Sequence, residues 1–248
     1  MNALLKQCQF EAVRALRNRQ FIFFSVLMPL IFYFIFVKVN GGNMQVEGTA
    51  WKAYFLMSMA AFSVVGSSMF GLAGRVAFER TQGWLRLVQT TPLPHYAYVI
   101  GKCLSQLMVG LVSVVVLFLV GAVSQGVDLS VGQWGISLLW LVLGSLPFVA
   151  IGILVGVLFS TEATYLVCNI LNMGLGILGG LWWPITIMPK VMQHIAYATP
   201  TYRFAHVTWQ VIGGKSIPVE DVAILLGYLA VLVALTLWVL RRKQVQDA

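Results

Sequence analysis

Residues 53–74, AYFLMSMAAFSVVGSSMFGLAG, form a continuous stretch of 22 residues without Asp, Glu, Lys, Arg or His. A helix needs about 20 apolar residues to cross the hydrocarbon core of a bilayer. Helices on the surface of soluble proteins instead carry a polar face opposite their apolar one. The stretch therefore predicts a transmembrane helix.

Five further stretches have the same character, at residues 21–37, 103–123, 134–159, 165–187 and 222–240. Of the 248 residues, 59% are hydrophobic and 10% are charged, whereas soluble domains have about 45–50% apolar and about 25% charged residues. This composition excludes a soluble enzyme, a disordered chain and a disulfide scaffold. We expect an all-α, polytopic membrane protein in which residues 1–248 form a single transmembrane domain of six helices.

Basic residues flank these stretches unevenly, and the imbalance predicts how the chain lies in the membrane. Cytoplasmic segments of membrane proteins carry an excess of Lys and Arg. If both termini are cytoplasmic, the inner segments hold eleven of the 16 basic residues, and each side has four acidic residues. The net charge of +8 then divides into +7 inside and +1 outside. We expect a multi-pass protein of the cell membrane with cytoplasmic termini, whose basic residues face a lipid bilayer rather than nucleic acid.

Residues 1–20 predict an amphipathic helix that lies in the plane of the membrane interface. Such a helix buries its apolar face near the lipid headgroups and keeps its charged face in water. A solvated helix that packs on a partner is the alternative. On a helical wheel one face carries Leu4, Leu5, Cys8, Ala12, Ala15 and Leu16, and the other carries Lys6, Gln7, Glu11, Arg14, Arg17 and Asn18.

The six predicted spans contain no Asp, Glu, Lys, Arg or His, which disfavours a proton-coupled carrier, an ion pump or a voltage sensor. Asn169 and Asn172 are their most polar side chains, and we expect them to line a path for an apolar or amphipathic cargo. We predict no catalytic residue and no metal site, because the three histidines lack the spacing of a zinc motif. Gly214-Lys215-Ser216 lacks the earlier glycine of a P-loop, so no nucleotide site is predicted either.

The loop between the second and third predicted spans is residues 75–102, RVAFERTQGWLRLVQTTPLPHYAYVIGK. A polar run at 79–83 precedes several apolar residues, and the pattern stops at Pro92, because the residue before a proline disfavours helix. The loop predicts a short amphipathic helix on the cytoplasmic side. Its apolar residues need either a protein partner or the membrane surface.

This loop resembles that of the ABC-2 family, the membrane subunits of type V ABC transporters. The family has a Glu-Arg pair, a Gly, a Leu-rich turn, Thr-Pro-Leu and Gly-Lys in this order. The chain departs from the pattern at Thr81 and Trp84, where the family commonly has Glu and Thr. It matches with Glu79-Arg80, Gly83, Leu85, Leu87, Thr91-Pro92-Leu93 and Gly101-Lys102.

A second resemblance to the same family lies at the end of the fifth predicted span. The family has Gly-Leu-x-x-Pro there, then a second Pro, then Pro-Thr or Pro-x-Tyr after a short amphipathic stretch. Together with the six spans and the amphipathic start, the resemblance covers nearly the whole chain. The matching residues are Gly179-Gly180-Leu181-Trp182-Trp183-Pro184, Met188-Pro189 and Ala198-Thr199-Pro200-Thr201.

The resemblance implies that the cytoplasmic coupling loop, residues 75–102, contains a coupling helix that docks into a groove on a separate ATP-binding subunit. A loop that lies on the lipid headgroups is the alternative. The implied apolar contacts are Trp84, Leu85, Leu87 and Val88, the implied polar contacts are Glu79 and Arg80, and Gly83 and Pro92 belong to the same docking site.

On the outer face, the resemblance implies that residues 182–217 form re-entrant half-helices that cap the path. Irregular backbone at membrane depth is tolerated where protein or water satisfies it. An aromatic belt at the interface is an additional interpretation of Trp182, Trp183 and Tyr202. The implied extracellular gate consists of Trp182, Trp183, Pro184, Pro189, Pro200 and Tyr202.

The function that the resemblance implies is that of a permease half in an ATP-driven exporter. A second copy of the chain or a paralogue would complete the membrane part, and ATP and Mg²⁺ would bind to the partner ATPase, with no cofactor in this chain. The compact loops resemble the drug, antibiotic and peptide branch, so the expected cargo is amphipathic or hydrophobic and leaves the cytoplasm or inner leaflet. Export of a lipid-linked polysaccharide is the nearest alternative. A further alternative is an intramembrane enzyme or a passive channel. Either of these needs polar residues that the predicted spans lack.

Overall fold

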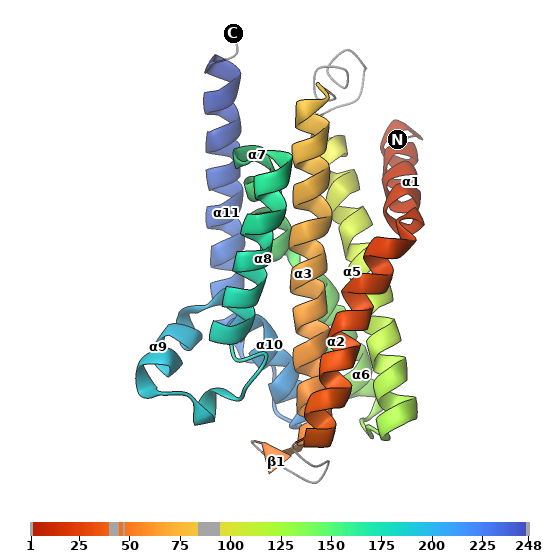
Figure 1. The fold of residues 1–248 in the computed structure, drawn as a ribbon, viewed down its shortest axis with the longest axis vertical. Helices are drawn as coiled ribbons and strands as arrows, with labels where there is room; N and C mark the ends of the chain where they lie inside the picture. Colours follow the sequence, from red (N-terminus) through yellow and green to blue (C-terminus); the bar gives the residue numbers. More distant parts are fainter. Residues whose placement is uncertain (1, 40–44, 47, 84–94, 247–248) are drawn as a thin grey trace.

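Long helices run side by side along most of the molecule (Figure 1). The computed structural model describes residues 2–39, 45–46, 48–83 and 95–246. Both termini lie at the same end of the bundle, as a chain with both ends on one side of a membrane requires. The elements are α1 (Asn2–Arg17), α2 (Arg19–Val39), β1 (Gln45–Val46), β2 (Thr49–Ala50), α3 (Trp51–Thr81), α5 (His95–Gln125), α6 (Val131–Leu143), α7 (Leu146–Leu158), α8 (Thr161–Leu178), the 3₁₀ turn η1 (Ile185–Ile187), α9 (Lys190–Ala198), α10 (Pro200–Ile212) and α11 (Val219–Gln246).

Five helical segments of the described chain are long and apolar enough to cross a membrane. They correspond to the first, second, third, fourth and sixth stretches that the sequence predicts as spans. The all-α, polytopic membrane fold is therefore confirmed at this level. The segments are Arg19–Val39, Trp51–Thr81, Tyr98–Gln125, Val131–Leu158 and Val219–Leu240.

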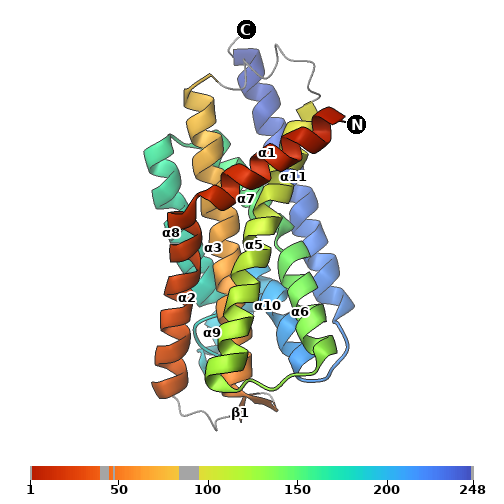
Figure 2. The same ribbon diagram turned by 90° about the vertical axis from the view of Figure 1, so that its right-hand side faces the viewer.

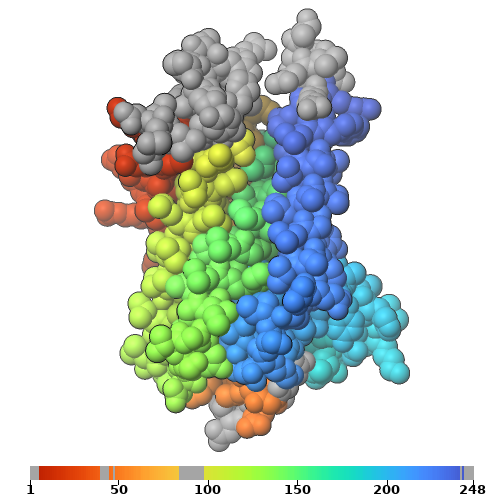
Figure 3. Space-filling model, turned by 180° about the vertical axis from the view of Figure 1, so that it is seen from behind, coloured from red at the N-terminus to blue at the C-terminus, as the bar shows by residue number. Residues whose placement is uncertain are grey.

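The helix α3 is the centre of the bundle, with α2, α5, α7 and α8 packed around it (Figure 1). It is buried over almost its whole length, from Trp51 to Ala77. The helix α11, by contrast, runs along the outside of the bundle (Figure 3), where Leu226, Val231 and Trp238 are exposed. An apolar surface of this kind suits contact with lipid.

The fourth predicted span is two helices rather than one bent helix. The chain breaks at Gly144 and Ser145, between α6 and α7, and Pro147 lies in the first turn of α7. Proline is well tolerated there, because its missing N–H has no partner within the helix in any case. Pro29, by contrast, lies within the continuous helix α2.

The fifth predicted span, residues 165–187, extends beyond the helix that the structure has in this place. The helix α8 covers 18 residues, and Gly179 follows it as its C-cap. Gly180 then adopts a positive φ of 76°, a backbone conformation that residues with a Cβ rarely accept. The chain leaves the helix at this glycine pair, and the 3₁₀ turn η1 is a separate element.

The helix α1 crosses the bundle obliquely (Figure 2) and packs mainly on α5. Phe10 and Val13 are each 63% exposed, as expected of an interfacial helix. The expectation that Glu11 lies on a water-facing side is wrong, because Glu11 is only 2% exposed. Its side of the helix faces α3 and α5, where cationic side chains compensate its charge.

Glycines allow α7 to approach the backbone of α3 closely. A Cβ at Gly152 would lie 2.9 Å from the carbonyl oxygens of Ser68 and Met69, and one at Gly156 would lie 2.6 Å from the carbonyl oxygen of Ala73. Small residues spaced in this way permit close contact between membrane helices. The glycine pair of α7 therefore packs inside the chain.

We expect Gly152→Ala to lower the free energy of unfolding by about 1–3 kcal/mol, because the added methyl group overlaps fixed backbone atoms. Gly174→Ala on α8 is the matched control, since a Cβ there meets nothing within 4 Å. Alanine is the better helix former, so the control should gain about 0.5–1 kcal/mol. Thermal unfolding of both variants in one detergent measures the difference, and an equal gain for both would contradict this packing.

Candidate functional site

Five charged side chains meet at the end of the bundle that carries the termini. We call them the ionic cluster. They come from α1, α3 and α5, which lie far apart in the sequence. Its members are Glu11, Arg14, Arg75, Glu79 and Lys102.

Lys102 is the most enclosed member of the ionic cluster, at 1% exposure. Its Nζ lies 2.8 Å from Oε2 of Glu79 and 3.5 Å from Oε1 of Glu11. Arg14 contributes a second contact to Glu79, at 2.9 Å, and the hydroxyl of Tyr98 donates to the same carboxylate. A buried carboxylate is tolerated when its charge is paired and its oxygens accept hydrogen bonds, and Glu79 meets both conditions.

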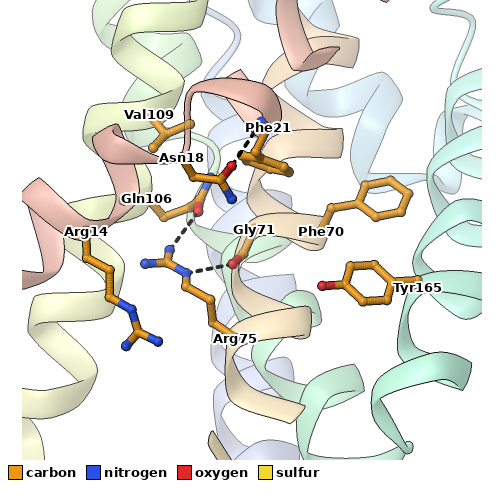
Figure 4. Close-up of a pocket in the computed structure, with 10 residues that line it drawn as sticks. Arg14, Asn18, Phe21, Phe70, Gly71, Arg75, Gln106, Val109 and Tyr165 are labelled. Carbon is orange, nitrogen blue, oxygen red and sulfur yellow. Dashed lines mark hydrogen bonds between the residues drawn. The ribbon is translucent and has the colours of Figure 1, made fainter. Parts of the chain in front are cut away.

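Arg75 connects the ionic cluster to the neighbouring helices (Figure 4). Its Nε donates to the carbonyl oxygen of Gly71 at 2.7 Å, and its Nη2 donates to Oε1 of Gln106 at 3.2 Å. Its Nη1 lies 3.4 Å from Oε2 of Glu11. One guanidinium thus joins α1, α3 and α5 through its planar set of donors.

The position of Gly101 explains why α1 can reach this cluster. A Cβ at Gly101 would lie 3.3 Å from Cγ of Gln7 on α1, so the two helices cross closely there. Gly101 and Lys102 are adjacent in the sequence and both contact α1. Gly101 leaves space for the helix, and Lys102 binds the carboxylate of Glu11. The pair matches the family pattern in the sequence, but its contacts with α1 were not predicted.

Three of the predicted coupling residues are described, and two of them, Glu79 and Arg80, have partners within the chain. Glu79 belongs to the ionic cluster and is 3% exposed. Arg80 donates from Nη1 to the carbonyl oxygen of Val157 and from Nη2 to that of Phe159, the latter at 2.6 Å. These contacts hold the last turn of α3 against α5 and α7.

The rest of the predicted coupling site lies at or beyond the end of α3. Gly83 is exposed and has a φ of +67°, which turns the chain away from the helix axis. The other residues lie outside the described part of the chain, and their docking role stays a prediction. They are Trp84, Leu85, Leu87, Val88 and Pro92.

At the opposite end of the bundle, the region after α8 contains the short elements η1, α9 and α10. Pro184 is the N-cap of η1, Pro189 is the N-cap of α9, and Pro200 is the first residue of α10. Each proline begins an element, where its missing N–H costs nothing. The prolines of the predicted gate therefore determine where these short helices begin.

The aromatic residues of the predicted gate pack onto the bundle. The ring of Trp182 lies 4.6 Å from that of Phe32 on α2 and 5.6 Å from that of Phe62 on α3, measured between centroids. Trp183 is 44% exposed. Tyr202 stacks on His206 at 5.0 Å. Their roles as an extracellular gate and as an aromatic belt stay predictions.

The helix α10 is joined to α8 and α11 by polar contacts. Thr201 donates to the carbonyl oxygen of Leu175 at 2.6 Å, and its Oγ1 occupies the space that a Cβ at Gly179 would need. Arg203 lies 2.7 Å from the carboxylate of Asp221. Burial alone lowers the pKa of the Arg203 guanidinium, but its hydrogen bond with Asp221 and the nearby negative charges outweigh burial and raise that pKa.

A groove of about 290 Å³ lies between α2, α3 and α8. Its walls are mainly apolar, with Phe24, Phe32 and Phe62 among them, and both predicted path residues, Asn169 and Asn172, line it. Asn169 is exposed and Asn172 is 6% exposed. The Oδ1 atom of Asn172 has no hydrogen-bond partner among the described residues. An amide oxygen without a partner therefore lies buried at the apolar wall of the groove.

Comparison with known proteins gives two matches. The sequence model described as "ABC-2 family transporter protein" matches residues 38–241. The chain is also 38% identical, over 244 residues, to a protein of Bacillus subtilis (strain 168) named "Putative transport permease YvfS". That alignment covers 98% of this chain and 99% of the relative.

Proposed function

Because the chain belongs to the ABC-2 family and is therefore a membrane permease subunit of an ABC transporter, we propose that it exports an amphipathic or hydrophobic substrate. An antibiotic, a drug or a peptide has this chemistry. The cargo leaves the cytoplasm or the inner leaflet, and the chain acts as a transport subunit rather than as an enzyme.

The groove between α2, α3 and α8 is the observation that carries this proposal. Its apolar walls suit the apolar part of a cargo, and the unpaired Oδ1 of Asn172 suits one hydrogen-bond donor on it. Gly66 keeps the floor of the groove open, because a Cβ there would lie 3.1 Å from Nδ2 of Asn172. A small ion has no charged ligand in this groove among its lining residues.

The energy for transport comes from a separate ATP-binding subunit, which holds ATP and Mg²⁺. It docks on the coupling loop, residues 75–102, and two permease chains, identical or paralogous, form the membrane part. An effector shifts a conformational equilibrium only by its differential interaction with the two states. ATP supplies this difference in interaction within its own subunit. The ionic cluster transmits the resulting conformational change from the coupling loop to α1, α3 and α5.

In the membrane, the chain crosses six times and both termini face the cytoplasm. The helix α8 supplies the sixth crossing: its 18 residues extend about 27 Å, close to the thickness of a bilayer core. Both termini lie at one end of the bundle, which agrees with an even number of crossings. Residues 182–217 form the re-entrant cap on the outer face.

We expect Asn172→Leu to reduce ATP-dependent transport roughly tenfold, the effect of losing about one hydrogen bond to the cargo. The permease is expressed with its ATP-binding subunit and reconstituted in vesicles, and uptake of a fluorescent amphipathic peptide is measured. Removing an unpaired buried polar atom should leave thermal stability unchanged or raise it.

Met173→Leu is the matched control, because it changes a groove side chain without removing a polar atom. Transport by this variant should stay within about twofold of the wild type, as volume-conserving apolar exchanges are well tolerated. Equal transport by Asn172→Leu and the wild type would show that the groove is not part of the transport path. ATP hydrolysis without movement of any amphipathic compound would refute export.

A further inference from the structure

A second cavity, of about 230 Å³, opens beside the ionic cluster at the junction of α1 and α2 (Figure 4). Arg14 and Asn18 line it from the α1–α2 junction, Arg75 from α3, and Tyr165 from α8. We call it the junction pocket. Because two arginines and an asparagine line it, the pocket suits a small polar group.

The junction pocket is electropositive. The ionic cluster beside it contains three cations, Arg14, Arg75 and Lys102, and two carboxylates, so it keeps one positive charge in excess. Of these cations, Lys102 is enclosed, whereas the side chain of Arg14 is 40% exposed and that of Arg75 is 18% exposed. The excess charge is therefore accessible on the side that lines the pocket.

Several donors around the junction pocket are not used within the described part of the chain. Arg14 donates to Glu79 through Nη1, and its Nε and Nη2 have no acceptor there. Asn18 accepts from the backbone N–H of Phe21 at 3.2 Å through Oδ1, which leaves its amide nitrogen free to donate. The hydroxyl of Tyr165, which is directed toward the arginine side of the pocket in Figure 4, also has no hydrogen-bond partner among these residues.

Phe21, Phe70 and Val109 form an apolar part of the wall of the junction pocket. They lie on helices that are long and apolar enough to cross a membrane. The exposed Phe10 and Val13 on α1 place this junction at the boundary between the apolar and polar layers of a bilayer. A ligand that fits has an anionic end beside the arginines and an apolar part beside the phenylalanines.

We propose that the junction pocket binds the phosphate of an anionic glycerophospholipid headgroup, with the first methylene groups of the lipid beside Phe21 and Phe70. Guanidinium groups pair with phosphate through charge-assisted hydrogen bonds, and basic pockets between membrane helices bind lipid headgroups. Arg14, Asn18 and Tyr165 supply the donors, and Arg75 supplies charge. This site is separate from the groove and does not depend on the export proposal.

Binding of dioctanoylphosphatidylglycerol to the purified full-length permease in a neutral detergent tests the site, with native mass spectrometry as the readout. We expect saturable binding to the wild type, a loss of affinity of roughly tenfold in Arg14→Gln and of roughly threefold in Tyr165→Phe. Tyr165→Phe removes only the hydroxyl of a half-exposed side chain, so it keeps the test valid if Arg14→Gln folds poorly. Arg17→Gln is the matched control, because Arg17 is an exposed arginine of α1 outside the pocket.

Two further ligands identify the source of the phosphate. Dioctanoylglycerol, which lacks the phosphate, should bind at least tenfold more weakly, and inorganic phosphate should not compete at equal concentration. Inorganic phosphate that binds as tightly as the lipid, and loses affinity in Arg14→Gln, would overturn the lipid assignment in favour of a free anion. Unchanged lipid binding in Arg14→Gln and Tyr165→Phe, or an equal loss in Arg17→Gln, would overturn the site itself.

Discussion

Replacing Lys102 with methionine is expected to lower the free energy of unfolding by about 3–5 kcal/mol, because it leaves carboxylates buried with too little compensating charge. Lys102 is 1% exposed, and its ammonium group lies between Glu79 and Glu11. Arg14 and Arg75 remain, so the loss should stop short of complete unfolding. Thermal unfolding and the yield of folded protein in detergent measure the effect.

A double-mutant cycle assigns that loss to the ionic cluster. Glu79→Gln removes one of the two carboxylates, so adding it to Lys102→Met should recover about 1–3 kcal/mol. Lys215→Met is the control, since Lys215 is an exposed lysine at the other end of the bundle. It should change stability by less than about 0.5 kcal/mol. Strictly additive effects of the two cluster substitutions would show that the lysine stabilises the chain by packing alone.

The membrane spans were predictable because their signal is local. An apolar stretch of sufficient length predicts a membrane helix whatever surrounds it, and five of the six predicted stretches are long, apolar helices in the structure. Their ends were less predictable. The break at Gly144 and the early end of α8 at Leu178 depend on which residues accept a turn and on the helices packed beside them.

The ionic cluster could not be predicted from the sequence because its contacts are not local. Glu11 and Lys102 are separated by 91 positions, and each alone resembles an ordinary charge at the border of a membrane span. The helical wheel assigned Glu11 to water because the wheel contains no information about neighbouring helices. Only the crossing of α1 over Gly101 places that carboxylate beside α3 and α5.

This cluster also gives the coupling loop two fixed ends. Glu79 lies near the start of the loop, in the last turns of α3, and Lys102 is the last residue of the loop, early in α5. Their contact at 2.8 Å joins the two helices on either side of the predicted docking residues. If the ATP-binding subunit docks on this loop as proposed, a force that it applies there reaches both helices through a short, buried link.

The double variant Trp84→Asp and Leu87→Asp is expected to weaken binding of the ATP-binding subunit about 1,000-fold and to abolish transport. Large apolar residues at the centre of an interface each contribute about 2 kcal/mol or more, and two such losses correspond to about three orders of magnitude. A carboxylate in place of each also has to be desolvated on docking. Co-purification through a tag on the permease measures the association, and vesicle uptake measures transport.

The matched control introduces two aspartates elsewhere in the chain. Val131 and Val219 are 88% and 78% exposed and begin α6 and α11 at the end opposite the termini. Aspartate is favourable in the first turn of a helix, so Val131→Asp with Val219→Asp should fold and retain the ATP-binding subunit. If the loop variant also retains that subunit and its transport-linked ATP hydrolysis, Trp84 and Leu87 lie outside the docking surface. If both double variants lose it, the loss reflects added negative charge rather than the loop.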